Sequence, residues 1–243
     1  MTQDASSFSP STTPAAQPDA AGNRIAAWPS EPQQLFLLLP GEATQADDWQ
    51  ALAHSLAQTF AQGAVAVLAL PADMAQAKAD PAAAVAALRQ LVQQWQARAG
   101  LDFARTALIA QGQLASIAMQ AVMRHVDLCA RLFAVGGHLP EQTMPIAEHT
   151  CLHWLHVQDE SGPSAEQAHE WGQCLQALDV DFTLDVLESS AVTAGPPELQ
   201  QRILHLLQNH VPRRLWREAL ASANALDAAQ SATRGDQSTW HQV

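Results

Sequence analysis

Residues 106–125 read TALIAQGQLASIAMQAVMRH, and the fold class predicted for the chain starts from this stretch. Thr106–Ala110 is a short apolar run, typical of a strand that is buried on both faces. Gly112 follows almost at once, and the segment from Gln113 to about His125 is predicted as a helix. The stretch therefore predicts a strand that turns sharply into a helix at a glycine.

The same alternation continues on both sides of this stretch. Five further apolar runs predict strands: Leu35–Leu39, Val65–Leu70, Arg131–Val135, Cys151–Val157 and Phe182–Leu187. Helices are predicted between them, because Asp80 and Pro81 form a helix start and Ser164 can cap another helix. Strands that alternate with helices of this length imply right-handed crossovers. The sequence predicts an α/β fold with a mostly parallel central sheet of about six or seven strands and helices on both faces.

Composition separates this predicted domain from the two ends of the chain. Residues 1–34 are rich in Ser, Thr, Pro, Ala and Gln, so a disordered N-terminal arm is expected. Residues 35–220 form the predicted domain, whose last helix is interrupted at Pro212 and resumes to about Leu220. The small and polar residues of 221–243 predict a flexible C-terminal tail.

The charge balance argues against several classes of partner. The 243 residues include 12 basic and 24 acidic side chains, a formal net charge of -12. An acidic surface repels phosphate, so neither nucleic acid nor an anionic membrane surface is an expected partner. No apolar run reaches the roughly 18 residues of a membrane span. Three cysteines without a C-x-x-C pair, and a start without a secretory signal, predict a cytoplasmic location.

In a mostly parallel sheet, a ligand site is expected where the strands end at their carboxyl edge. The segments that follow the predicted strands there are Pro40–Glu42, Gln111–Gln113, Gly136–His138, Gln158–Glu160 and Ser189–Thr193.

Three stretches, in this order of elements, resemble the α/β-hydrolase fold and, more narrowly, the carboxylesterase/phospholipase family of small bacterial serine esterases. They are Trp95–Gly100 leading into Thr106–Ile109, Phe182–Glu188, and Val211–Leu220. The resemblance covers about 35–220. It implies ester hydrolysis by a Ser nucleophile in a G-x-S-x-G turn, a His base, an acidic residue that orients the base, and backbone N–H donors for the oxyanion.

The catalytic positions that the resemblance implies hold other residues here. The nucleophile position falls on Gly112, which has no side-chain atom that can attack a carbonyl. The histidine position falls on Val192, with no histidine close by in the sequence. The position of the acidic residue falls on Glu160, next to Asp159. Two of the three catalytic groups are therefore expected to be missing.

The expected oxyanion region differs as well. Pro40-Gly41 stands where the family has His-Gly, and proline has no N–H to donate. Glu42 would add a negative charge where an oxyanion forms. Gln111 and Gln113 flank Gly112 and are expected to line the same pocket, together with His138 after the fourth predicted strand.

Together these residues predict a catalytically inactive pseudo-hydrolase without a cofactor. Its expected role is to bind a small acyl- or ester-type ligand or a protein partner. An alternative is an active esterase with relocated groups, in which His138 works with a serine such as Ser116, Ser189 or Ser190. A third alternative is a structural subunit that associates with an active homologue. The sequence specifies neither the ligand nor the oligomeric state.

One further pattern, Cys151-x-His153-x-x-His156, resembles a set of metal ligands. On a strand, Cys151 and His153 share one face and His156 lies on the other. Since no further ligand has a suitable spacing, no metal site is predicted. His149, His153 and His156 are expected to lie at the edge of the sheet. Glu42, Asp47 and Asp48 could also be taken as a cation cluster, but the two aspartates are interpreted as helix caps.

Overall fold

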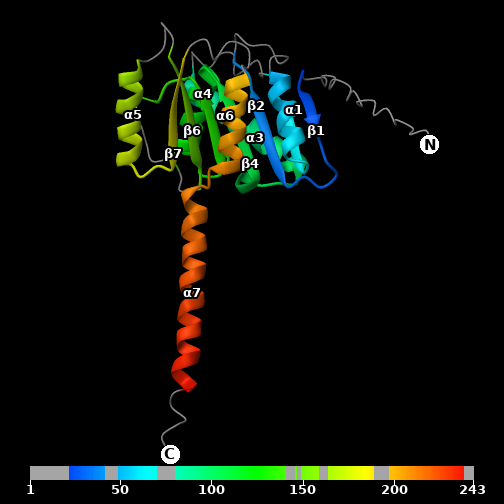
Figure 1. Cartoon of the computed structure of the whole chain (residues 1–243). Coiled ribbons are helices and arrows are strands. Elements are labelled where there is room, and N and C mark those ends of the chain that lie inside the picture. The colour runs from blue at the N-terminus through cyan, green and yellow to red at the C-terminus, as the bar shows by residue number, and fades with distance from the viewer. Residues whose placement is uncertain are drawn as a thin grey trace, which may run out of the picture.

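Within the described residues, seven strands form one sheet in the order β1-β3-β2-β4-β5-β6-β7 (Figure 1). The structure is a computed structural model that describes residues 22–41, 49–69, 80–140, 146, 149–158, 164–188 and 197–237. The strands are β1 (Arg24–Ala27), β2 (Gln34–Leu39), β3 (Gly63–Val67), β4 (Thr106–Gln111), β5 (Arg131–Val135), β6 (Cys151–Gln158) and β7 (Phe182–Glu188). Strands β2 to β7 pair in parallel, and β1 is antiparallel to β3. The predicted, mostly parallel α/β sheet is confirmed.

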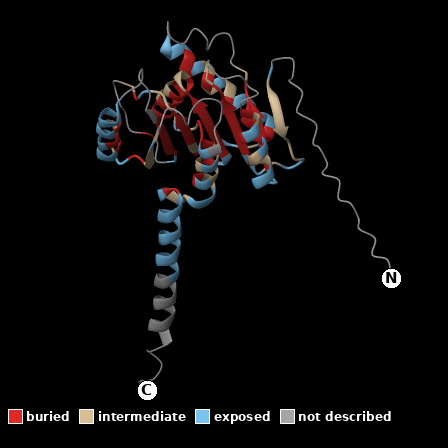
Figure 2. Cartoon of the chain, turned by 45° about the horizontal axis from the view of Figure 1, so that its top comes forward, coloured by how far each residue is buried: buried red, intermediate tan, exposed pale blue. Residues whose placement is uncertain are grey.

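Helices cover both faces of this sheet, as the sequence predicts. They are α1 (Gln50–Thr59), α3 (Pro81–Ala99), α4 (Gln113–Arg124), α5 (Ala165–Ala177) and α6 (Pro197–Asn209). A further helix, α7 (Arg213–Gln237), follows α6 and covers neither face. Alternate residues of the central strands pack against α3, α4 and α5 on one face and against α1 and α6 on the other. Figure 2 shows the central strands as the buried layer between the helices, while the edge strand β1 is of intermediate burial. Burial on both faces explains the uninterrupted apolar runs in the sequence.

The side chains of Asp80 and Ser164 cap helices α3 and α5, as the sequence predicts. The Asp80 side chain accepts hydrogen bonds from the backbone N–H groups of Ala82 and Ala83, both at 3.0 Å, at the start of α3. The Ser164 hydroxyl oxygen accepts a bond of 3.2 Å from the Gln167 N–H at the start of α5. Each cap satisfies amide groups that have no partner within the helix.

The strand order creates one switch point in the sheet. The chain runs from β2 outward to β3 on one side, and from β4 through β7 on the other. The neighbouring strands β2 and β4 therefore end where the winding direction reverses, which is where ligands bind in open α/β sheets. Gly41 follows β2, and Gln111 ends β4 directly before Gly112. The fold thus brings the predicted site residues of two strands to one place.

Two of the predicted boundaries are wrong. Strand β1 lies inside the predicted N-terminal arm, because pairing with β3 gives Arg24–Ala27 hydrogen-bond partners that composition does not reveal. The last helix runs to Gln237 instead of ending near Leu220. Alanine is the best helix former, and the alanine-rich sequence beyond Leu220 contains no proline. Residues 1–21 and 238–243 lie outside the described part of the chain.

Helix α7 extends away from the sheet as an isolated rod (Figure 1). Its side chains are mostly exposed over 213–226, and the Trp216 side chain is 65% exposed. Among the described residues, no helix is both long and apolar enough to cross a lipid bilayer.

The Arg131 guanidinium fixes the helix that precedes this rod. Arg131 begins β5 and donates hydrogen bonds to the carbonyl oxygens of Leu206 and Leu207, both at 3.2 Å, and of His210, at 2.9 Å. The last carbonyl groups of a helix have no partner within that helix. Arg131 therefore holds the end of α6 against the amino-terminal edge of the sheet.

We expect the substitution Arg131→Leu to lower the free energy of unfolding by about 2–3 kcal/mol, since hydrogen bonds to a charged group contribute about 1.5–3 kcal/mol. Urea denaturation followed by circular dichroism measures this change. Arg105→Leu is the control, because Arg105 is exposed and its bond to the Gln33 carbonyl is 3.5 Å long. Equal losses in the two variants would contradict an anchoring role for Arg131.

Candidate functional site

The turn between β4 and α4 is the centre of the candidate site. Gly112 has φ 60° and ψ -126°, a conformation that L side chains rarely adopt. Its N–H donates a hydrogen bond of 2.8 Å to the carbonyl oxygen of Val135 at the end of β5. Among the described residues, a Cβ atom built on Gly112 would meet no heavy atom within 4 Å. The chain thus makes a sharp strand-to-helix turn whose central residue faces open space and carries no side chain.

The end of strand β2 lies against this turn. The Gly41 N–H donates a hydrogen bond of 3.2 Å to the side-chain Oε1 of Gln111. In the turn chemistry of serine hydrolases, a backbone N–H of this loop is one donor to the oxyanion, and the N–H after the nucleophile is the other. In this protein the Gly41 N–H, which would correspond to the first of these donors, is hydrogen-bonded to the Gln111 side chain instead. Pro40, the preceding residue, has no N–H.

A second contact joins the end of β5 to the start of α4. The His138 backbone N–H donates a hydrogen bond of 2.8 Å to the Ser116 hydroxyl oxygen. Gly137 directly precedes His138 and packs against the turn. A Cβ atom at Gly137 would stand 2.9 Å from the Gly112 carbonyl oxygen and 3.0 Å from the Ser116 nitrogen. Ser116 therefore holds the β5 loop close to the turn.

The His138 side chain lies on the exposed rim of the site. Its ring meets the edge of Trp171 with 6.3 Å between centroids. Trp171 in turn stacks on Trp154, whose indole N–H donates to the Gly136 carbonyl oxygen at 3.1 Å. Among the described residues, no histidine ring is hydrogen-bonded to a serine hydroxyl. His138 is thus placed by aromatic packing and by its backbone.

The structure brings together part of the predicted site. Pro40, Gly41, Gln111, Gly112, Gln113 and His138 all follow the carboxyl ends of β2, β4 and β5, which are neighbours in the sheet. The other predicted positions lie outside the described residues: Glu42, Asp159, Glu160, Ser189, Ser190 and Val192. The positions of the acidic residue and the histidine therefore remain predictions. Asp47 and Asp48, which the sequence predicts to be helix caps, also lie outside the described residues.

Comparison with known proteins agrees with this arrangement. No protein-family model matches the sequence, and no curated protein matches it. Solved structures do match. Esterase PE8 is 16% identical with a TM-score of 0.57, over 80% of this chain and 97% of the esterase. The Bacillus cereus carboxylesterase is 13% identical with a TM-score of 0.56, over 74% of this chain and 90% of that one. A phospholipase/carboxylesterase from Dyadobacter fermentans is 14% identical with a TM-score of 0.54, over 78% and 99%.

This chain has the α/β-hydrolase fold. At identities this low, the structural match establishes the shared architecture and nothing further. It confirms the fold that the sequence resemblance implied. In that fold a strained strand-to-helix turn presents the nucleophile. The β4–α4 turn with Gly112 at φ 60° is a sharp strand-to-helix turn, and its assignment to the nucleophile position remains a prediction.

The second predicted pattern, around Cys151, lies at the opposite edge of the sheet. Cys151 and His153 share one face of β6 as predicted, and their Sγ and Nε2 atoms are 3.6 Å apart. The prediction that His153 and His156 edge the sheet is wrong, because both are fully buried in β6, between β5 and β7. His149 is exposed, and its ring packs against Phe103.

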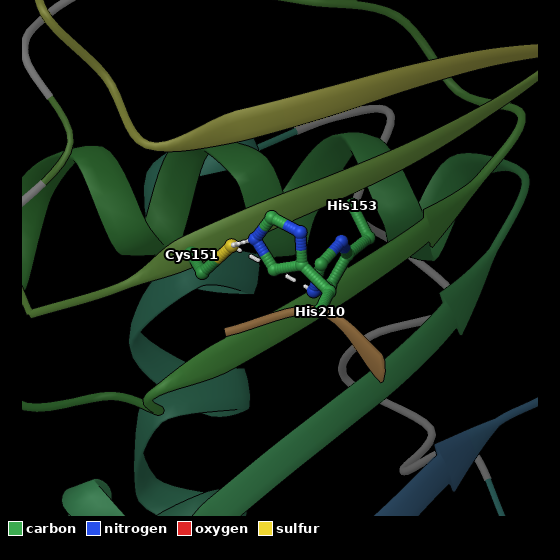
Figure 3. Close-up of side chains that lie close together, drawn as sticks. All are labelled: Cys151, His153 and His210. Carbon is green, nitrogen blue, oxygen red and sulfur yellow. Dashed lines mark hydrogen bonds between the residues drawn. The ribbon is translucent and has the colours of Figure 1, made fainter. Parts of the chain in front are cut away.

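Sequence reasoning missed one member of this group. His210 follows α6, 59 residues after Cys151, and its Nε2 lies 3.5 Å from the Cys151 Sγ (Figure 3). Burial lowers the pKa of His153 to about 3, so this ring is neutral at neutral pH, and burial also lowers the pKa of His210. Burial, followed by the neighbouring Asp181, raises the pKa of the Cys151 thiol. Only the contact between the end of α6 and the start of β6 could have revealed this group.

The two glycines of the site differ in a testable way. Gly112→Ala should lower the free energy of unfolding by about 1–2 kcal/mol, the cost of a left-handed backbone for an L residue, because its Cβ has free space. Gly137→Ala has a similar backbone, with φ +78°, and adds the clash with the Gly112 carbonyl. We therefore expect Gly137→Ala to lower the free energy of unfolding by about 1–3 kcal/mol more than Gly112→Ala does.

Chemical denaturation of the two alanine variants measures the difference, with the wild type as reference. If Gly137→Ala proved as stable as Gly112→Ala, the β5 loop would not lie against the turn.

Proposed function

We propose that this protein is a non-catalytic member of the α/β-hydrolase fold, a pseudo-hydrolase related to carboxylesterases. The observation that carries the proposal is Gly112 in the strained turn, at φ 60°, with no side-chain atom facing the open space. Ester hydrolysis in this fold needs a nucleophile at that place. Removal of the nucleophile or the base of a serine triad costs on the order of 10⁶ in turnover. A chain with this turn therefore lacks the first requirement of the reaction.

The surroundings of the turn support the proposal. The Gly41 N–H, a candidate oxyanion donor, is directed at Gln111 Oε1 at 3.2 Å. The Ser116 hydroxyl, a candidate for a relocated nucleophile that lies within the described residues, accepts a hydrogen bond of 2.8 Å from the His138 N–H. That bond gives Ser116 a structural role and leaves the His138 ring on the rim, against Trp171.

The proposed role is binding, of a small acyl- or ester-type ligand or of a protein partner. The positive φ of Gly112 supports this role, and so does the free space that the described residues leave beside its Cα. A carbonyl group could approach the backbone there without reacting. The three cysteines are all free thiols, which supports the cytoplasmic location proposed for this role.

Fluorophosphonate labelling tests the missing chemistry. We expect no labelling of the wild type, and none above background for Gly112→Ser, because the assigned histidine position is Val192 and a serine without a base is a weak nucleophile. Mass spectrometry of the intact protein detects the adduct, with an active serine esterase labelled in parallel.

Labelling of the wild type would show a relocated nucleophile. Rapid labelling of Gly112→Ser would show that a base already serves the turn and that the histidine position has been misassigned. Denaturation curves for Gly112→Ser, measured beside those of Gly112→Ala, verify that the variant is folded.

A further inference from the structure

A cluster of sulfur and nitrogen atoms lies at the amino-terminal edge of the sheet, away from the Gly112 turn. It consists of Cys151 and His153 on β6 and His210 directly after α6. Figure 3 shows both imidazole rings turned toward the Cys151 sulfur. The three ligand atoms lie within 4.8 Å of one another, Cys151 and His153 are buried, and His210 is half-buried. The cluster belongs to no part of the proposed hydrolase-like site.

The spacing of two of the three ligand pairs matches tetrahedral coordination. The two imidazole nitrogens of the third pair lie within 4.8 Å of each other and would have to approach to about 3.3 Å around an ion. Zinc binds thiolate sulfur at about 2.3 Å and imidazole nitrogen at about 2.0–2.1 Å, so sulfur and nitrogen ligands lie about 3.6 Å apart at a tetrahedral angle. In the structure, the Cys151 Sγ is 3.6 Å from His153 Nε2 and 3.5 Å from His210 Nε2. Two ligand pairs thus stand at the distances that a bound ion requires.

Thr183 orients one of the rings. The Thr183 hydroxyl and the His153 Nδ1 are 2.9 Å apart, on the side of the ring that faces away from Cys151. Metal-binding histidines almost always use their second nitrogen in such a contact, which fixes the ring and leaves the other nitrogen for the metal. His153 is further held by stacking on Phe133, with 4.5 Å between ring centroids. The ring is therefore set before any ion arrives.

The local charges are compatible with a divalent cation. The Asp181 carboxylate is near enough to interact with the Cys151 thiol. When a metal–sulfur bond forms, the thiol proton leaves to solvent. The thiolate then offsets one charge of the ion, and Asp181, which is also paired with Arg213, adds negative charge close by. The guanidinium of Arg131, which acts on the Cys151 thiol, donates to the three carbonyl groups at the end of α6.

From this geometry we propose that Cys151, His153 and His210 form a binding site for a borderline-soft divalent metal ion, with Zn²⁺ as the expected occupant. One sulfur and two imidazole nitrogens are ligands that zinc prefers, and they occupy three of four tetrahedral positions. The fourth position is left for water or another small ligand.

Such an ion would tie together two distant parts of the chain. Cys151 starts β6, and His210 lies three residues before Arg213, the first residue of α7. Arg213 is itself held, since its N–H donates to Asp181 Oδ2 at 2.8 Å. The metal would thus fix the base of α7, the rod that projects from the domain (Figure 1).

A cobalt titration of the full chain, expressed without a histidine tag and stripped with a chelator, tests the site. We expect one Co²⁺ per chain, with intense visible bands of tetrahedral cobalt and a sulfur-to-cobalt charge-transfer band that added Zn²⁺ removes. Cys151→Ser should abolish the charge-transfer band. Cys174→Ser is the matched control, because Cys174 is an exposed cysteine on α5 and should leave the spectrum unchanged.

Two further variants keep the test informative if Cys151→Ser does not fold. His210→Gln changes a half-buried ligand, and Thr183→Val changes only the partner of His153. Changes to such partners cost about 10–100-fold in metal affinity, so we expect Thr183→Val to fall in this range and His210→Gln to lose at least as much. Zn²⁺ should raise the Tm of the wild type and leave that of His210→Gln unchanged.

The proposal fails if the wild type binds no stoichiometric cobalt. It also fails if the spectrum survives in Cys151→Ser or disappears in Cys174→Ser. In those cases the cluster is a hydrogen-bonded group of a thiol and two imidazoles. None of these readouts depends on ester hydrolysis, so the result is independent of the proposed function.

Discussion

The positive φ of the backbone at Gly112 is the constraint on which the candidate site depends. A chain that leaves β4 and enters α4 within one residue must turn sharply, and Gly112 does so at φ 60°. The Gly112 N–H is fixed to the Val135 carbonyl, and the Gly137 backbone lies against its carbonyl oxygen. Neighbouring loops are positioned by these contacts, which hold the turn in shape without a side chain at Gly112. A strained turn of this kind is normally retained for chemistry. Here we infer that it is retained as a binding surface.

The two edges of the sheet serve different purposes in this account. At the carboxyl edge, the backbone N–H groups of Gly41 and His138 are hydrogen-bonded to side chains on either side of the Gly112 turn. At the amino-terminal edge, Arg131 and the Cys151 cluster hold the end of α6, from which α7 projects. The parallel sheet separates the two regions, because strands that run in one direction collect loops of one kind at each edge. A ligand site and a clamp for a projecting helix can therefore coexist in one small domain.

Much of this architecture could be predicted from the sequence, because burial on both faces leaves a visible apolar run in each parallel strand. The strands predicted from the apolar runs at Leu35–Leu39 and Arg131–Val135 agree with the boundaries of β2 and β5 to within one residue. The Gly112 turn was also predictable, since a glycine stands between an apolar strand and a helix. Strand β1 was not, because a short edge strand gains its stability from the partner β3 and shows little pattern of its own. Helix α7 was hidden by small residues that resemble a tail in composition, although alanine favours a helix.

The side-chain contacts were less accessible to sequence reasoning. Nothing local connects Gly41 to Gln111, 70 residues away, or Cys151 to His210, 59 residues away. Both contacts arise only when parallel pairing fixes which strand and helix ends meet.

The most direct measurement of the central claim is the steady-state hydrolysis of short-chain p-nitrophenyl esters by the purified wild-type protein. The account predicts a rate equal to that of the buffer with heat-denatured protein. Turnover well above that background, lost in His138→Ala, would contradict it.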